Sequence, residues 1–174
     1  MRVLSGKYKN RKLKSPNNQK VRPTSSVVKK SLFDIIKNFD NKKVLDLFAG
    51  TGSLGLESIS RGAKNVVFVE KDRVAINILF NNLKNICPEE NYLVIKQDVE
   101  NFIKNEKQIY DIVFADPPYG LYEFQELKDK VCKLLKYGGI FCMEKAFDNK
   151  DYDEDVRVKK YGETQILIWE KNRK

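Results

Sequence analysis

The sequence contains no histidine, which removes the commonest general base and the commonest nitrogen ligand of metal ions. A Ser-His-Asp hydrolase or a histidine-based zinc enzyme is therefore strongly disfavoured. Cysteines are few, and Cys87, Cys132 and Cys142 show no Cys-x-x-Cys spacing. Such isolated thiols are typical of reduced cysteines in the cytoplasm, and we expect no metal site. The chemistry must then depend on carboxylates, backbone groups, aromatic rings, lysines or a cofactor.

Long apolar runs are also missing, since no stretch approaches the roughly 20 residues that cross a bilayer. The basic N-terminus lacks the apolar segment of a signal peptide. We therefore expect no membrane partner and a cytoplasmic location. The 174 residues, 41% hydrophobic and 33% charged, have the composition of one globular domain with its own core.

Acidic residues are absent from the first 33 positions, ten of which are basic. The remaining residues carry 23 basic and 24 acidic side chains, so the first fifth of the chain holds all of the net charge of +9. A dense cationic segment beside a nearly neutral domain suits a polyanionic partner. A solvated tail is the alternative, but interleaved apolar residues would allow packing: Val3, Leu4, Tyr8 and Leu13. We expect residues 1–24 to form a basic extension packed on a domain of residues 25–174.

Hydrophobic periodicity predicts helices that alternate with strands. The expected helices are one capped at 24–26 with apolar residues through Phe39, then 53–61, 72–86, 99–105 and 124–135. The expected strands are 43–48, 65–70, 92–96, 111–115 and 140–144, followed by a hairpin of 156–161 and 164–169. Continuous apolar strands between helices indicate a parallel sheet covered on both faces, with the hairpin as an antiparallel edge. We expect residues 148–155 to form an exposed loop.

A glycine-rich loop follows the first expected strand, at the edge where an open parallel sheet binds ligands. Gly50, Gly52 and Gly55 match the dinucleotide pattern Gly-x-Gly-x-x-Gly, which serves nicotinamide cofactors and S-adenosylmethionine alike. A turn without a ligand is the alternative. The loop predicts these cofactor-binding residues: Asp46, Phe48, Ala49, Gly50, Thr51 and Gly52.

Acidic residues end or follow the neighbouring strands. Glu70, with Lys71 beside it, stands where an acid takes ribose hydroxyls, although it could be a surface acid. Asp98, with Gln97, could contact an adenine amine, cap a helix, or do both. Asp46 lies inside an apolar strand and needs a partner, which could be a ligand ammonium group, a lysine or the backbone.

The motif Asp116-Pro117-Pro118-Tyr119 directly follows the strand expected at 111–115 and is the most specific feature of the chain. Two prolines end the strand in a stiff bend, which would fix a carboxylate, carbonyl oxygens and an aromatic ring in one pocket. An exocyclic base amine is a poor nucleophile because its lone pair is delocalised. Acceptors at Asp116 and Pro117 would orient this lone pair toward a methyl donor, and Tyr119 would stack on a withdrawn base.

The motif therefore predicts an amino methyltransferase with Asp116, Pro117, Pro118 and Tyr119 as catalytic residues and with Asp116 also bordering the cofactor. A proline-rich turn without catalytic function is the alternative.

With these motifs the chain resembles class I S-adenosylmethionine-dependent methyltransferases, and within them the bacterial 16S ribosomal RNA guanine-N2 methyltransferases. The resemblance covers nearly the whole chain. It rests on Ser5-Gly6-Lys7-Tyr8, Arg11-Lys12-Leu13, Arg22-Pro23-Thr24, Leu32-Phe33, Asp46 to Gly52, Glu70, Asp116 to Tyr119 and Tyr161-Gly162-Glu163-Thr164.

The resemblance implies a Rossmann-like fold with a seven-stranded, mostly parallel sheet, an antiparallel C-terminal hairpin and helices on both faces. It implies S-adenosylmethionine as cofactor, S-adenosylhomocysteine as product, and a monomer acting on 16S rRNA in the assembling small subunit. Residues 1–24 would then contact RNA. The residues expected on the RNA side are Lys7, Lys9, Arg11, Lys12, Arg22, Thr24 and Tyr119.

Three other functions remain open from the sequence. A DNA or RNA adenine or cytosine amino methyltransferase shares the chemistry, although DNA enzymes usually carry a target-recognition domain. A nicotinamide-dependent reductase explains the glycines and Glu70 but gives residues 116–119 no role. A non-catalytic RNA-binding protein would use only the basic extension.

Overall fold

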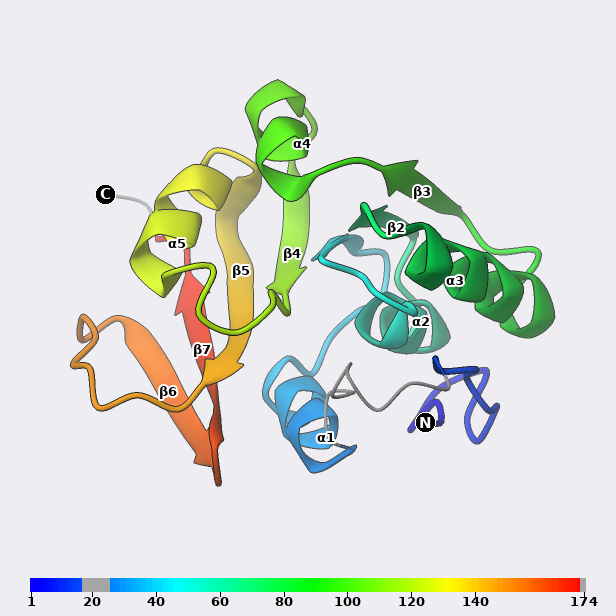
Figure 1. The fold of residues 1–174 in the computed structure, drawn as a ribbon, viewed down its shortest axis with the longest axis horizontal. Coiled ribbons are helices and arrows are strands. Elements are labelled where there is room, and N and C mark those ends of the chain that lie inside the picture. Colours follow the sequence, from blue (N-terminus) through cyan, green and yellow to red (C-terminus); the bar gives the residue numbers. More distant parts are fainter. Residues whose placement is uncertain (17–25, 173–174) are drawn as a thin grey trace.

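One sheet of seven strands, in the order β3-β2-β1-β4-β5-β7-β6, forms the centre of the computed structural model, which describes residues 1–16 and 26–172 (Figure 1). β1 to β5 run parallel, whereas β7 pairs antiparallel with both β5 and β6. The strand order reverses between β1 and β4, the place where open α/β sheets bind ligands. The strands are β1 (Lys43–Leu47), β2 (Asn65–Glu70), β3 (Tyr92–Lys96), β4 (Tyr110–Ala115), β5 (Leu135–Ala146), β6 (Val156–Tyr161) and β7 (Thr164–Glu170).

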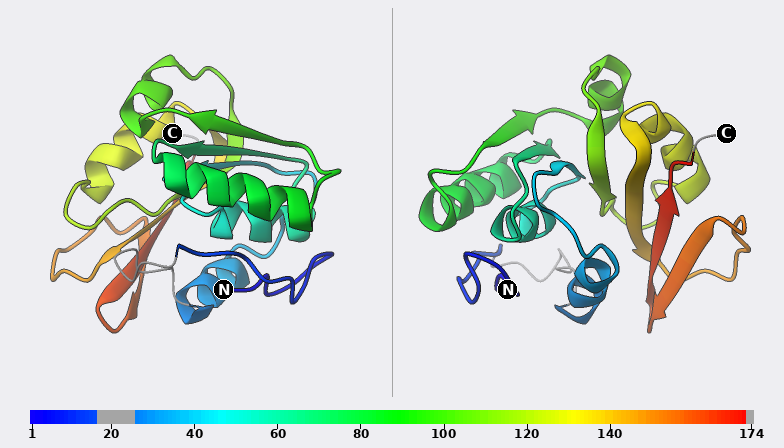
Figure 2. Two further views of the ribbon diagram at one scale, coloured as in Figure 1. Left: turned by 45° about the vertical axis from the view of Figure 1, so that its right-hand side comes forward. Right: turned by 180° about the vertical axis from the view of Figure 1, so that it is seen from behind.

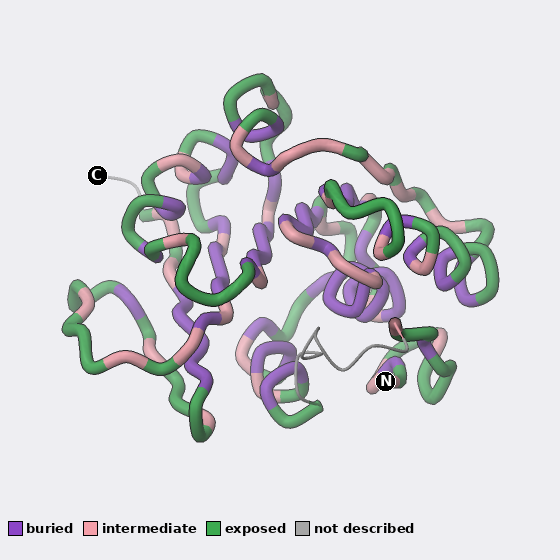
Figure 3. Tube along the Cα trace, viewed as in Figure 1, coloured by how far each residue is buried: buried purple, intermediate pink, exposed green. Residues whose placement is uncertain are grey.

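Helices cover both faces of the sheet (Figure 2). One face carries α1 (Ser26–Ile35), α2 (Ser53–Ser60) and α3 (Arg73–Ile86), and the other carries α4 (Val99–Asn105) and α5 (Phe124–Cys132). Alternate strand residues supply the two cores: Val44 and Phe114 pack on the α1–α3 side, and Leu45 and Val113 on the α4–α5 side. Buried positions therefore follow the strands and α2 (Figure 3). The predicted Rossmann-like fold is confirmed.

The boundary between α5 and β5 differs from the prediction of a helix at 124–135 and a strand at 140–144. The helix ends at Cys132, and β5 begins at Leu135, which pairs with Tyr110 before the register shifts and Ile140 pairs with Ile112. Leu134 and Leu135 continue the helical spacing of the α5 core residues. This spacing concealed the start of the strand.

Two other expectations need correction. The first helix ends at Ile35, and Phe39 lies beyond it while still packing its ring on Phe33; the predicted caps Thr24 and Ser25 lie outside the described residues. The loop at 148–155 is not uniformly exposed, because Asp148 accepts a hydrogen bond from Gln165 at 2.9 Å and pairs with Lys145 at 2.8 Å.

Residues 1–16 pack against α1, α2 and α3. Val3 and Leu13 are buried, and the backbone N–H groups of Leu4 and Ser5 donate to the buried Glu57 carboxylate of α2 at 2.7 and 3.0 Å. Lys29 of α1 lies 3.3 Å from the same carboxylate and donates to the Arg2 carbonyl at 2.9 Å. The backbone of this segment is thus fixed to two helices by buried charged groups.

Two general properties bear on function. No helix within the described ranges is both long and apolar enough to cross a bilayer. Over the same ranges, no group of three or more acidic or cysteine side chains is arranged to hold a metal ion.

Candidate active site

The loop after β1 is a tight backbone turn at the reversal of strand order. Phe48, Gly50 and Gly52 have positive φ angles of 59°, 54° and 86°. The Gly52 N–H donates to the Ala49 carbonyl at 2.8 Å, and α2 begins at the next residue. The loop therefore brings the amino end of α2 to the carboxyl end of β1.

The three glycines of the motif have different physical roles. A Cβ at Gly50 would meet only the Phe48 carbonyl oxygen at 3.9 Å, so the backbone there borders open space. A Cβ at Gly52 would lie 2.3 Å from Leu79, and one at Gly55 would lie 2.1 Å from the Phe68 ring. Gly52 and Gly55 thus allow α2 to pack on α3 and β2, while Gly50 leaves room for a ligand.

Asp46 is a buried carboxylate beneath this loop. Its Oδ2 accepts the Gly55 N–H at 2.8 Å, and the residue is 2% exposed. Burial raises the pKa of Asp46 to about 7, and the charges of Asp116 and Glu70 add to this shift. The structure thus supplies the backbone partner considered as one alternative. A role toward a ligand ammonium group stays a prediction.

Glu70 organises the loop from the end of β2. Its Oε2 accepts the Gly50 N–H at 2.8 Å, and its Oε1 accepts the N–H groups of Lys71 and Asp72, both at 2.8 Å. The Gln97 N–H donates to the Glu70 carbonyl at 3.0 Å, which places the end of β3 beside it. Glu70 is therefore a structural part of the loop as well as a candidate ribose acceptor.

Asp98 caps α4, because its Oδ1 accepts the Glu100 N–H at 3.0 Å. Its other oxygen lies 3.1 Å from the Lys71 ammonium group, which holds the pKa of Asp98 below its ordinary value. The capping alternative is thus realised. The predicted adenine contact stays a prediction, with Gln97, Lys71 and Asp98 grouped at the carboxyl ends of β2 and β3.

The Asp116 to Tyr119 motif leaves β4 next to the glycine loop. Asp116 is partly buried and close enough to Asp46 to raise its pKa, Pro117 is buried, and Pro118 is exposed. The Tyr119 ring is 43% exposed, and its hydroxyl lies 3.0 Å from the Thr164 hydroxyl on β7. The motif thus reaches from the end of β4 across β5 to β7 with an accessible aromatic ring.

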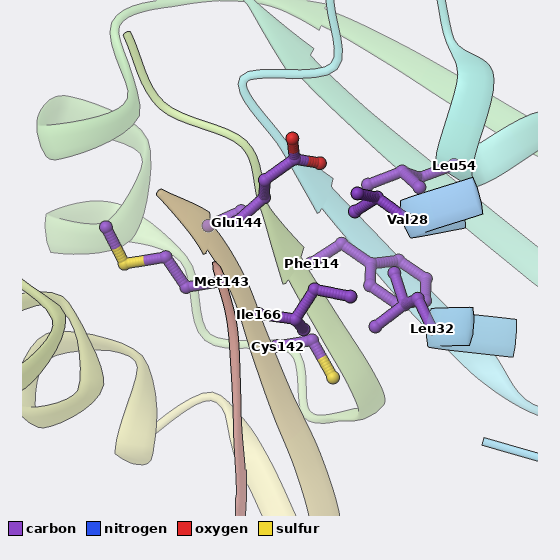
Figure 4. A pocket seen from close by; sticks show the side chains of 9 residues that line it. Val28, Leu32, Leu54, Phe114, Cys142, Met143, Glu144 and Ile166 are labelled. Carbon is purple, nitrogen blue, oxygen red and sulfur yellow. The ribbon is translucent and has the colours of Figure 1, made fainter. Parts of the chain in front are cut away.

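A small apolar pocket lies between α1 and the sheet (Figure 4), lined on β4 by Phe114 and Ala115, which precede this motif. With a cavity volume of about 10 Å³ it holds no more than about one water molecule. Val28 and Leu54 come from the helices, Phe114 from β4, and the partly buried Glu144 from β5. The pocket is therefore next to the start of the motif in the sequence and has Glu144 among its lining residues.

The predicted RNA-side residues divide into three groups. Lys9, Arg11 and Lys12 are exposed on the packed N-terminal segment, whereas Lys7 is exposed but pairs with Glu90 at 2.7 Å. Tyr119 lies at the sheet edge. Arg22 and Thr24 lie outside the described residues.

Three residues at the site had not been predicted. Thr164 positions Tyr119, the Tyr122 ring contacts the Phe48 ring edge-on at 4.8 Å, and the buried Asn82 donates to the Thr51 carbonyl at 3.0 Å. Thr164 already belonged to a segment that carried the family resemblance. Spacing alone gave no indication of the other two, because their partners are distant in the sequence.

The seven-stranded fold, the glycine loop and the Asp-Pro-Pro-Tyr motif at its switch point define a class I methyltransferase. A family model described as Conserved hypothetical protein 95 matches residues 1–170, and the chain belongs to this family.

Two relatives and one solved structure show how far the similarity extends. A Bacillus subtilis protein named as a candidate rRNA methyltransferase, YlbH, is 35% identical over 188 residues, covering 98% of this chain and 99% of that protein. Ribosomal RNA small subunit methyltransferase D of Haemophilus influenzae is 39% identical over 123 residues, covering 68% of this chain and 64% of that protein. The structure of yhhF from Escherichia coli, described as a candidate methyltransferase, has a TM-score of 0.87 at 26% identity, covering 100% of this chain and 99% of that one.

Proposed function

We propose that this protein transfers a methyl group from S-adenosylmethionine to the exocyclic amino group, N2, of a guanine in 16S rRNA. The observation that carries the proposal is the placement of Asp116 to Tyr119, which leaves β4 beside the glycine loop where the strand order reverses. The relatives named as rRNA methyltransferases support rRNA as the substrate.

The residues of the glycine loop fit the cofactor. Gly50 leaves room against the backbone, and Glu70 Oε2 accepts only the Gly50 N–H among the described contacts, so it can accept a ribose hydroxyl. Asp46 and Asp116 supply negative charge for the ammonium group of the amino-acid end, and Asp98 stands at the adenine end. The remaining residues proposed to line this site are Phe48, Ala49, Thr51, Gly52, Lys71 and Gln97. When bound, S-adenosylmethionine supplies a methyl group made electrophilic by its sulfonium.

The catalytic residues act by orientation and charge. The Asp116 carboxylate and the Pro117 carbonyl accept the two amine hydrogens, which directs the nitrogen lone pair toward the methyl carbon. As the nitrogen–carbon bond forms, the Asp116 carboxylate stabilises the positive charge that develops on nitrogen, which then loses a proton to solvent water. Tyr119 stacks on the withdrawn base. No histidine is required as a general acid, because the leaving group of the transfer would be a neutral sulfide.

The N-terminal segment provides the RNA contacts. Its backbone is fixed to α1 and α2, so the exposed Lys9, Arg11 and Lys12 are held at defined positions rather than on a solvated tail. Lys7, Arg22 and Thr24 complete the proposed RNA side. The proposed substrate is the assembling small subunit, methylated by a monomer in the cytoplasm.

Mass spectrometry of 16S rRNA from a strain that lacks the gene tests the proposal. One N2-methylguanosine should disappear and return with the wild-type gene, but not with Asp116→Ala. Retention of every N2-methylguanosine in the deletion strain would refute it.

A parallel assay separates the rival functions. The purified protein should methylate small subunits from the deletion strain and leave duplex DNA unmodified. It should bind S-adenosylhomocysteine and not NADH in calorimetry.

A further inference from the structure

Glu144 on β5 stands beside the proposed catalytic motif and has no role in the methyl transfer described above. In the parallel pairing of β4 with β5, Ala115 is opposite Met143. The next residues of the two strands are Asp116 and Glu144, and neighbouring strands lie about 4.8 Å apart. Asp116 and Glu144 are therefore neighbours at the carboxyl ends of two adjacent strands, where the proposed site opens.

The side chain of Glu144 lies on the face of the sheet that carries α1 and α2. Phe114 and Cys142 belong to the core on that face, and Glu144 is two residues after Cys142. Glu144 also lines the same pocket as Val28 and Leu54 (Figure 4). Asp46, which bonds to the amino end of α2, is on this face as well. Glu144 thus faces the region between the proposed cofactor loop and α1.

Tyr119 reaches from the end of β4 past β5, the strand that carries Glu144, to β7. Its hydroxyl bonds to Thr164, which pairs with Ala146 across β5 and β7, while Glu144 pairs with Ile166. Thr164 and Ile166 are two residues apart and share the α1 face. Glu144 therefore lies between the start of the motif at Asp116 and the hydroxyl group of Tyr119. A base stacked on Tyr119 with its amine at Asp116 would therefore lie beside Glu144.

From this arrangement we infer that Glu144 accepts the N1–H of the target guanine, and that it determines the preference for guanine. The inference rests on the proposed function. Guanine presents two adjacent donor groups, the N2 amine and N1–H, and a carboxylate accepts from N1–H. Adenine and cytosine each present a ring nitrogen without hydrogen beside their exocyclic amine, so the Glu144 carboxylate repels that lone pair. A site built to hydrogen-bond one group strongly rejects an analogue that lacks it.

The test compares guanine with 2-aminopurine at the target position of 16S rRNA in reconstituted small subunits. 2-Aminopurine keeps the amine at C2 but has no hydrogen on N1. The wild type should prefer guanine. Glu144→Gln replaces the charged acceptor of the guanine N1–H by a neutral carbonyl oxygen, so its kcat/KM for guanine should fall about 10- to 100-fold. Its amide N–H can also donate to the unprotonated N1 of 2-aminopurine. Its guanine-to-2-aminopurine ratio should fall at least about tenfold.

Two further variants separate specificity from structure. Glu144→Asp keeps the carboxylate, so its guanine-to-2-aminopurine ratio should stay above that of Glu144→Gln even if its rates fall. Glu170→Gln removes an exposed carboxylate at the end of β7 opposite to Thr164, where it pairs with Ile140, and should leave both rates unchanged. Melting temperature and S-adenosylhomocysteine affinity, measured on all variants, should match the wild type.

The outcomes distinguish the two hypotheses. Guanine methylation by the wild type with an unchanged base ratio in Glu144→Gln overturns the role of Glu144 and leaves the proposed function standing. Absence of N2 methylation of guanine by the wild type overturns both. A fall in the ratio for Glu144→Gln, without a fall in cofactor affinity, supports the role of Glu144.

Discussion

Asp46→Asn is expected to stabilise the protein at neutral and alkaline pH while it weakens cofactor binding. Asp46 is fully enclosed, and its carboxylate receives the Gly55 N–H. Asparagine has nearly the same shape, keeps an oxygen for that bond and carries no charge. The substitution therefore removes the cost of a buried negative charge at the position where a cationic ligand group is proposed to bind.

The size of the effect follows from the pKa of Asp46, which burial raises from 3.8 to about 7. Between these values the folded protein retains a proton that the unfolded chain has lost, so the free energy of unfolding of the wild type falls as the pH rises from 4 to 7. A shift of about 3 units corresponds to about 4 kcal/mol. Asparagine does not titrate, so the gain should be near zero at pH 4 and should reach at most about 4 kcal/mol at pH 8.

Thermal denaturation of both proteins from pH 4 to pH 8 measures this difference. The melting temperature of Asp46→Asn should exceed that of the wild type by up to roughly 10 °C at pH 8, and the two should converge toward pH 4. Calorimetry at pH 8 should show weaker S-adenosylhomocysteine binding by the variant. Parallel pH profiles for the two proteins would refute the reasoning, because Asp46 would then ionise as freely in the folded state as in the unfolded chain.

Three further predictions concern packing and charge. Gly52→Ala would place a side chain at a φ of 86° and a Cβ 2.3 Å from Leu79. Denaturant titration should therefore show a free energy of unfolding lower by about 2 kcal/mol or more, and an unchanged midpoint would contradict this prediction. Asn82→Ala removes hydrogen bonds to both Lys14 and Thr51, so it should lower the free energy of unfolding by about 2–4 kcal/mol and weaken S-adenosylhomocysteine binding. Asn81→Ala, at an exposed position on the same helix, should change neither quantity. Neutralising the exposed Lys9, Arg11 and Lys12 should weaken RNA binding and reduce the steepness of the plot of log K against log salt concentration by up to about 2. An unchanged slope would indicate that this segment does not contact RNA.

The elements of the fold were predictable because their patterns are local. The apolar run from Val66 to Val69 predicted a strand at 65–70, which are the bounds of β2, and the glycines after Asp46 marked the turn that the structure shows with positive φ angles. The start of β5 was not predictable, because Leu134 and Leu135 extend the apolar stripe of α5. Only the pairing of Leu135 with Tyr110 shows that the strand has begun.

The candidate site was only partly predictable for a related reason. Each motif residue could be assigned a chemical role from its neighbours in the sequence, but contacts between distant segments could not be assigned in this way. Asn82 bonds to Thr51 and to Lys14, which are 31 and 68 residues away. Its position within an amphipathic helix gave no reason to expect either contact. Glu144 likewise gains significance only from the strands on both sides of it.

Methyl transfer by Asp116→Ala, measured together with its cofactor affinity, tests the central claim most directly. With labelled S-adenosylmethionine and small subunits from the deletion strain, the wild type should form N2-methylguanosine at one position. The variant should form none while S-adenosylhomocysteine still binds, with an affinity that falls much less than the rate of methyl transfer. Undiminished methylation by the variant, or a loss of cofactor affinity as large as the loss of rate, would contradict the assignment of Asp116 as the group that holds the base amine.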